Sequence, residues 1–192
     1  MTASMNACIA ANATHPLQLA RNPERADTLA FAGVIAMSLQ ARRTPLIRGI
    51  SEDGFGMLVD EYFPGLRCRN GSATDLTGPG RLFEIDEFDD LVTLLLDHRA
   101  TERHQETWLA HAIATAAMGD NHLWQDMGLP SRKVLSELLS THFPALAAKN
   151  TGDMKWKKFF YRQLCERSGI PICKSPHCAE CCDFRICFGP EN

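Results

Sequence analysis

The 192-residue chain predicts an all-α fold, a pseudo-repeated helical bundle followed by a C-terminal Cys-rich metal-cluster loop. Apolar residues recur at helical spacing along most of the chain, and no segment shows the sustained two-residue alternation of a half-buried strand. Five of the eight cysteines fall within the last twenty residues. We therefore expect about six helices around one core, with a metal-binding tail beside them.

Composition and turn residues divide the chain into three parts. Residues 1–22 are expected to form an N-terminal arm, because the first fifteen are rich in Ala, Asn and Thr and show little periodicity. Residues 23–167 form the helical domain, and residues 168–192 form a Cys-rich cluster-binding tail that starts at a Gly-Ile-Pro turn. Residues 1–20 lack the basic start of a signal peptide, and no apolar stretch is long enough for a membrane span, so we expect a cytoplasmic protein.

The first half of the chain predicts two helices and a long connection. Residues 23–40 show helical spacing after Asn22-Pro23, which favours a helix start. Ser51 can cap a second helix over residues 52–62, which ends before Phe63-Pro64. Gly- and Pro-containing turns then predict an irregular connection to about residue 82.

Three further helices are expected in the second half, besides the repeated one described below. The helix that opens at Glu84 has an acidic first turn, which suits the positive end of the helix dipole. Its buried face is predicted to consist of Phe88, Leu91, Val92, Leu95 and Leu96. A helix over residues 102–118 is Ala-rich, so a neighbouring helix can approach it closely. The last helix, residues 154–167, has aromatic residues at core spacing.

An internal repeat accounts for the expected symmetry of the bundle. Residues 51–66 and 131–146 align without gaps and share the capping serine and a Phe-Pro pair. The helices before them also correspond, which gives pseudo-repeats at about 28–66 and 108–146. We expect two helical pairs related by a rough two-fold axis.

The turn between the helices of the second repeat contains polar and aromatic residues that the first repeat lacks. These are Asp120, His122, Trp124 and Asp126. Loop residues of these types on a helical scaffold are candidates for function. The alternative is that the polar residues cap the turn while Trp124 fills the core, and the sequence leaves both interpretations open.

The tail has four cysteines at the spacing Cys173-x4-Cys178-x2-Cys181-x5-Cys187. Thiolates are soft ligands, and four of them within fifteen residues can close around one soft metal centre. The first two intervals are those of plant-type ferredoxins, whereas zinc modules more often contain two separated Cys-x2-Cys pairs. The spacing therefore favours an iron–sulfur cluster over structural zinc, and zinc over disulfides. Cys165 could be a further ligand, but a buried thiol is the better interpretation.

Charge is unevenly distributed, although the net charge of the chain is only −3. Residues 149–192 contain 8 basic and 5 acidic side chains, while the remainder of the chain is acidic. The expected basic patch consists of Lys155, Lys158, Arg162, Lys174 and Arg185. Such a patch is either a solvated helix face or a site of attraction for an anion or an acidic partner. The charge is too small to indicate nucleic-acid binding.

Three segments resemble the NifQ family of nitrogen-fixation proteins. They are the run from Met154 to Cys165 (MKWKKFFYRQLC), the four-cysteine tail with its CFGPE ending, and residues 119–129 (GDNHLWQDMGL). The resemblance implies an iron–sulfur protein that carries molybdenum to the assembly of the nitrogenase iron–molybdenum cofactor. It implies a Mo–Fe–S cluster or a 4Fe–4S-type precursor, with molybdate or its carrier as the source. The recipients it implies are the NifEN scaffold and the NifH reductase.

A cluster of three irons and one molybdenum needs only three thiolates on iron, so the molybdenum takes a fourth ligand. Besides the fourth cysteine, the nearest candidates in sequence are His177, Cys182 and Asp183. Two other functions use the same thiolates: a ferredoxin-like electron carrier and a zinc-stabilised interaction module. The chain shows no nucleophile motif, phosphate loop or dinucleotide fingerprint, so we do not expect an enzyme.

Overall fold

The computed structural model describes residues 15–66, 68–71, 82–169 and 184–191. Within these ranges every regular element is a helix and none is a strand, which confirms the all-α class. The elements are η1 (Pro16–Leu19), α1 (Ala26–Gln40), α2 (Glu52–Tyr62), α3 (Leu82–Asp97), α4 (His104–Ala117), α5 (Leu123–Asp126), α6 (Arg132–His142), α7 (Pro144–Ala147), α8 (Trp156–Ser168) and α9 (Phe184–Phe188).

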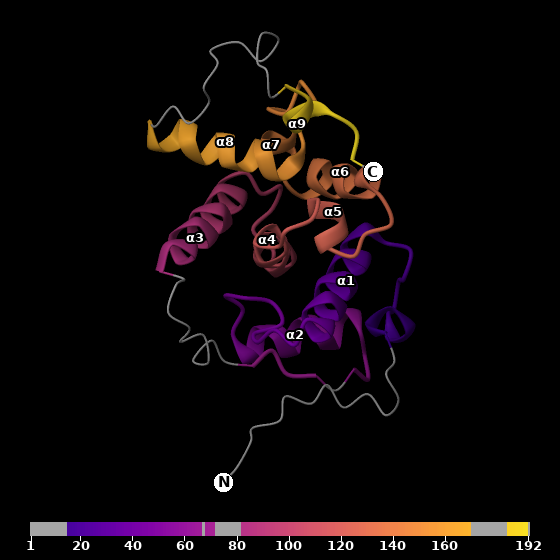
Figure 1. The fold of residues 1–192 in the computed structure, drawn as a ribbon. Coiled ribbons are helices and arrows are strands. Elements are labelled where there is room, and N and C mark those ends of the chain that lie inside the picture. The colour runs from indigo at the N-terminus through magenta and orange to yellow at the C-terminus, as the bar shows by residue number, and fades with distance from the viewer. Residues whose placement is uncertain (1–14, 67, 72–81, 170–183, 192) are drawn as a thin grey trace.

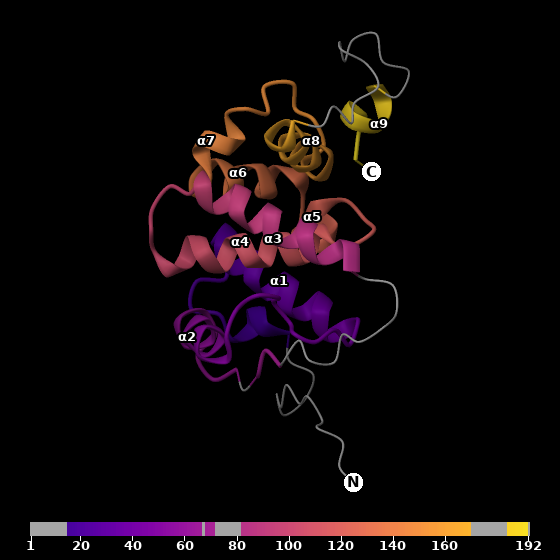
Figure 2. The same ribbon diagram turned by 90° about the vertical axis from the view of Figure 1, so that its left-hand side faces the viewer.

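The helices are stacked in layers around α4 (Figures 1 and 2). In the view of Figure 2, α1 and α2 form the lower layer, α3 and α4 the middle one, and α7 and α8 the upper one. Helix α4 packs against α1, α3 and α5, and ten of its fourteen residues are buried. The sequence predicts that a neighbouring helix can approach this Ala-rich segment closely, and the structure packs three helices against it.

Small residues permit this close packing. Gly33 in α1 lies directly against the backbone at Met127 and Gly128, and a Cβ added to it would overlap the carbonyl oxygen of Met127. Gly128 has a φ of 63°, a conformation that glycine adopts without steric cost. The link between α5 and α6 therefore lies directly on α1.

Helix α1 begins three residues later than its sequence predicts. Asn22 to Arg25 form a turn in which the N–H of Arg25 donates to the carbonyl of Asn22 at 3.2 Å. The guanidinium of Arg25 then binds the carboxylate of Asp27, which is 2% exposed and also accepts from the hydroxyl of Tyr62 at 3.2 Å. This buried network fixes the helix start at Ala26 rather than at Pro23. Before it, η1 packs against α1, so residues 16–19 belong to the folded part of the chain.

The two repeated segments have the same local structure. Ser51 accepts from the N–H of Gly54 at 3.1 Å and Ser131 from the N–H of Val134 at 3.4 Å, and each begins an eleven-residue helix. The helices end at Phe63 and Phe143, which have nearly the same backbone conformation. Phe63 has φ −132° and ψ 60°, and Phe143 has φ −135° and ψ 54°. The two-fold relation between complete helical pairs stays a prediction.

Candidate functional site

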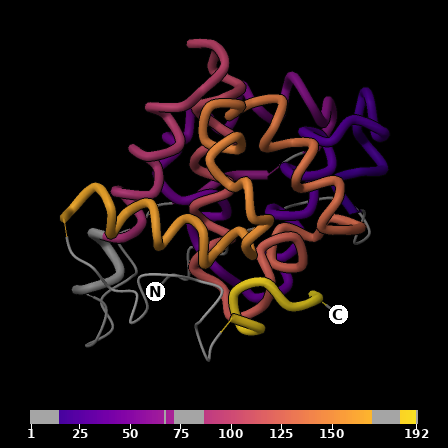
Figure 3. The backbone as a smooth tube through the Cα atoms, turned by 90° about the horizontal axis from the view of Figure 1, so that it is seen from above, coloured from indigo at the N-terminus to yellow at the C-terminus, as the bar shows by residue number. Residues whose placement is uncertain are grey.

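The C-terminal segment lies against the beginning of α8. The N–H of Lys155, the residue before α8, donates to the carbonyl of Cys187 at 2.8 Å. In α9 the rings of Phe184 and Phe188 stack with their centroids 4.6 Å apart. Seen from above, α9 lies beside the start of α8 and the turn that leads into α5 (Figure 3). Cys187, one of the predicted cluster ligands, is therefore held next to the basic end of α8.

Glu191 provides a second anchor for this segment. Its side chain is 5% exposed, and its carboxylate lies 3.5 Å from Nε of Arg132 and 3.9 Å from Nδ1 of His122. Arg132 is itself held by Asp153, which accepts two hydrogen bonds of 2.8 and 2.9 Å from its guanidinium. The end of the described chain is thus tied to α6 and to the turn that precedes α5.

The turn over residues 119–126 is organised around Asp126. Its carboxylate is 8% exposed and accepts from the backbone N–H of Asn121 at 3.0 Å, from the Asn121 amide at 2.9 Å and from the ammonium of Lys157 at 2.5 Å. Gly119 leaves room for this arrangement, because a Cβ on it would lie 2.5–2.8 Å from the carboxylate. Asp126 therefore holds the turn together and joins it to α8.

The other candidate residues of this turn divide between structure and surface. Trp124 is half-buried and packs against the hydrophobic core. His122 is the N-cap residue of α5, and its backbone N–H donates to Oε1 of Gln125 at 3.1 Å. Asp120 is exposed. In this turn Trp124 and Asp126 have structural roles. Asp120 and His122 lie nearer the surface, where a ligand could contact them.

An open groove of about 570 Å³ lies between this turn, the start of α8 and the C-terminal segment. Its lining consists of Asp120, Asn121, His122, Leu123, Gln125, Lys155, Trp156, Lys157, Lys158, Ile186 and Glu191. The groove brings together two sets of residues that the sequence singles out separately, the polar turn and the basic run of α8. The sequence does not identify Lys157 or Glu191 as members of this site.

Three lysines line this groove, and their ammonium groups have different surroundings. Lys157 is 17% exposed and is bound to Asp126 and to the carbonyl of Gly119, at 2.5 and 2.7 Å. Lys158 is exposed and Lys155 is half-buried. The first turn of α8 contains no acidic residue, and no side chain caps its N-terminus. The dipole of α8 therefore adds to the positive potential at this end of the groove.

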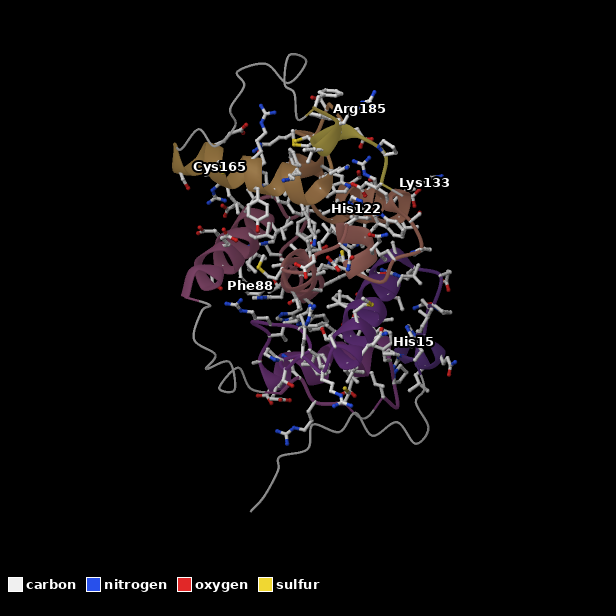
Figure 4. All side chains as sticks on the ribbon, in the orientation of Figure 1. His15, Phe88, His122, Lys133, Cys165 and Arg185 are labelled. Atoms are coloured by element: carbon white, nitrogen blue, oxygen red, sulfur yellow. The ribbon has the colours of Figure 1, made fainter. Side chains whose placement is uncertain are left out.

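The other predicted residues lie elsewhere. Arg162 pairs with Glu166 at 2.9 Å, and Arg185 is exposed on α9. Cys165 lies ten residues after Lys155, about 15 Å along the axis of α8, and Figure 4 shows it toward the far end of the helix from Arg185. Burial raises the pKa of the Cys165 thiol, which opposes the thiolate form that a metal requires. Cys173, Lys174, His177, Cys178, Cys181, Cys182 and Asp183 lie outside the described residues.

Within the described ranges, no three His, Cys, Asp or Glu side chains are grouped closely enough to hold a metal ion. Cys187 is the one member of the predicted thiolate set that the structure describes, and its carbonyl accepts from the N–H of Lys155, one of three lysines that line the groove. Soft thiolate donors next to positive charge fit an anionic iron–sulfur cluster. Among the described helices, none combines the length and apolar character that crossing a membrane requires.

Comparison with known proteins identifies the family. The NifQ family model matches residues 30–189. The chain is 38% identical over 155 residues to Protein NifQ of Azotobacter vinelandii, covering 77% of this chain and 80% of that protein. It is 37% identical over 143 residues to Protein NifQ of Rhodobacter capsulatus, with coverages of 74% and 76%. Protein NifQ of Klebsiella pneumoniae is 49% identical over 81 residues, which cover 42% of this chain and 48% of that protein. No solved structure matches the chain. Because the family model spans most of the sequence and two relatives align over about three quarters of it, the chain belongs to the NifQ family.

Proposed function

We propose that this protein is an iron–sulfur protein that binds molybdenum and donates it for biosynthesis of the nitrogenase iron–molybdenum cofactor. Membership of the NifQ family implies a role in nitrogen fixation and molybdenum processing. The thiolates of Cys173, Cys178, Cys181 and Cys187 hold the cluster, which supplies iron and sulfide as the anchor for molybdenum. Cys182, His177 and Asp183 are the candidates for a ligand to molybdenum itself.

One observation carries the proposal beyond family membership: Cys187 lies next to the basic end of α8. The hydrogen bond from the N–H of Lys155 to its carbonyl supports a position for this residue close to a groove lined by lysines. Thiolate-ligated clusters are anionic, so nearby ammonium groups favour the loaded protein. The same charges favour acidic surfaces on recipients, for which we propose the NifEN scaffold and NifH.

We propose a carrier rather than an enzyme, working in the cytoplasm. A carrier requires that its cargo be reached by a recipient, and Cys187 belongs to a short helix none of whose residues is buried. A ferredoxin-like electron carrier needs the same thiolates but keeps its cluster. A zinc-stabilised module uses the metal only to fold the tail.

Metal analysis of protein purified without oxygen tests the proposal. We expect iron, acid-labile sulfide and molybdenum, and a brown chromophore. Zinc without iron would identify the interaction module, and iron without molybdenum would identify the electron carrier. Both outcomes contradict the proposed function.

Serine substitutions then test the ligand set. Cys178→Ser and Cys181→Ser should abolish stable iron binding, because hard alkoxide oxygen is a poor substitute for thiolate on iron. Cys165→Ser is the matched control and should keep its iron. Cys182→Ser should keep iron but lose molybdenum if Cys182 is the molybdenum ligand. Normal iron and sulfide contents in the first two variants would overturn the assignment.

A further inference from the structure

The groove near Cys187 contains lysines that differ in whether an acidic side chain pairs with them. The ammonium of Lys157 is bound to Asp126 and to a backbone carbonyl. For Lys155 and Lys158, by contrast, the described residues provide no ion pair. Lys155 is the N-cap residue of α8 and Lys158 is the third residue of the helix, and both line the groove.

The acidic residues that line the groove do not cancel this charge. The carboxylate of Glu191 lies 3.5 Å from Nε of Arg132, so it already has a cationic neighbour. Asp120 is the remaining carboxylate, and it is exposed to solvent. The groove therefore retains two ammonium groups, a histidine ring and the amide of Gln125 around a space open to solvent.

This donor set suits a small tetrahedral anion. Lysine ammonium groups are compact charges with three rotatable donors, and they do not demand the planar, two-pronged geometry that arginine offers to carboxylates. The groove is lined by Ile186, the neighbour of Cys187 in the sequence, and by Lys155, whose N–H donates to the carbonyl of Cys187, so an anion bound there is close to the backbone of a proposed cluster ligand.

We infer that the groove formed by Lys155, Lys158 and His122 binds molybdate as an intact dianion, at a site on the helical scaffold that is separate from the thiolates. The identity of the anion rests on the proposed function, whereas the site itself rests on the groove and its charges. All four molybdenum–oxygen bonds remain intact in this step. The groove holds molybdate beside the cluster before any ligand exchange with sulfur.

Equilibrium dialysis of the full chain against molybdate at low ionic strength tests the inference. The double variant Lys155→Gln/Lys158→Gln should bind molybdate at least about tenfold more weakly, since it loses two charged donors. The matched control is Lys133→Gln/Lys149→Gln, which removes the same charge outside the groove. Lys133 is 85% exposed on α6, and the ammonium of Lys149 lies 2.8 Å from Nε2 of His98. Equal weakening in both double variants would overturn the site.

A variant that removes a negative charge from the groove should have the opposite effect on molybdate affinity. Asp120→Asn removes the exposed carboxylate from the groove and should tighten molybdate binding by about threefold, as expected for a solvent-exposed charge. Sulfate and phosphate serve as competing tetrahedral anions. Either of them binding as tightly as molybdate would overturn the assignment to molybdate.

Cysteine variants separate this inference from the proposed function. Cys178→Ser/Cys181→Ser should lack the cluster and still bind molybdate in the groove, because the groove uses no thiolate. Loss of molybdate binding in this variant, with normal binding in Lys155→Gln/Lys158→Gln, would overturn the groove and leave the proposed function standing. If the unsubstituted chain, purified without oxygen, bound molybdate in the groove but contained no iron, the proposed cluster would be overturned and the anion site would stand.

Discussion

The ammonium of Lys157 and the carboxylate of Asp126 form an ion pair at 2.5 Å, which joins the first turn of α8 to the turn before α5. The two side chains are 17% and 8% exposed. Lys155 and Lys158 lie within two residues of Lys157 and line the same groove, so this pair also helps to hold the start of α8 at the groove. The pair is a structural feature that positions a candidate binding site.

Removing one partner of this pair should destabilise the protein strongly. Asp126→Asn leaves a mostly buried ammonium without its counter-charge, and we expect the free energy of unfolding to fall by about 3 kcal/mol. Urea denaturation measures this loss. The double variant Asp126→Asn/Lys157→Met should recover part of it, because the uncompensated charge is gone. A loss below about 0.5 kcal/mol in the single variant, typical of an exposed pair, would contradict the buried role.

Two glycine-to-alanine substitutions within helices should have opposite effects. In α1, Gly33→Ala places a Cβ against the carbonyl oxygen of Met127, so backbone must move and we expect a loss of about 2–4 kcal/mol. In α2, a Cβ on Gly56 meets nothing within 4 Å. Gly56→Ala should therefore gain up to about 1 kcal/mol from helix propensity. Thermal unfolding of both variants measures the difference, and similar shifts would contradict the close contact of α1 with residue 127.

Asp27 should make stability depend on acid pH. Burial raises the pKa of its carboxyl, but the hydrogen bonds from Arg25 and from the N–H of Thr28, with the charge of Arg25, outweigh burial and hold the pKa below its usual value. Since the folded pKa is the lower one, the contribution of Asp27 is complete above the unfolded pKa of about 4 and is lost as pH falls through the folded pKa.

The corresponding test compares two unfolding profiles. Asp27→Asn should be less stable than the natural chain at pH 7, and its free energy of unfolding should fall less steeply between pH 5 and 2. Denaturant titrations across that range measure both quantities. Parallel profiles for the two proteins would show that Asp27 does not contribute to the acid dependence.

Glu191 should control how firmly the C-terminal segment is held. Glu191→Gln removes the charge that Arg132 faces, and we expect cleavage by trypsin after the exposed Arg185 to accelerate about tenfold, as a loss of about 1.4 kcal/mol implies. Glu137→Gln, which removes a 61% exposed carboxylate from α6, is the control and should leave the rate unchanged. Equal cleavage rates in all three proteins would mean that Glu191 does not anchor the segment.

Local features of the fold are those that the sequence predicts well. The bounds of α2 follow from Ser51 and from the Phe63-Pro64 stop, because capping and proline chemistry act within a few residues. The start of α1 follows from a network instead, in which Asp27 accepts from Tyr62 across 35 positions of the chain. Spacing cannot reveal a contact of that kind, since it depends on how the helices pack.

The candidate site shows the same division. The sequence singles out Lys155 and Lys158 in one segment and His122 in another, but it contains no signal that these residues line one groove. It also suggests a functional role for Asp126 that the structure accounts for by its pairing with Lys157. The sequence does not distinguish Lys157 from the neighbouring lysines, because its burial depends on a partner 31 residues away.

The contrast between α4 and α9 has a consequence for how the molecule opens. Ten residues of α4 are buried, while none of the described residues of α9 is. Amide protons of α4 should exchange with solvent only when the whole bundle unfolds, whereas those of α9 should exchange through a small local opening. The segment that carries Cys187 can therefore detach and return many times while the helical scaffold stays folded. Loading and unloading of a cluster at this segment then requires no unfolding of the core.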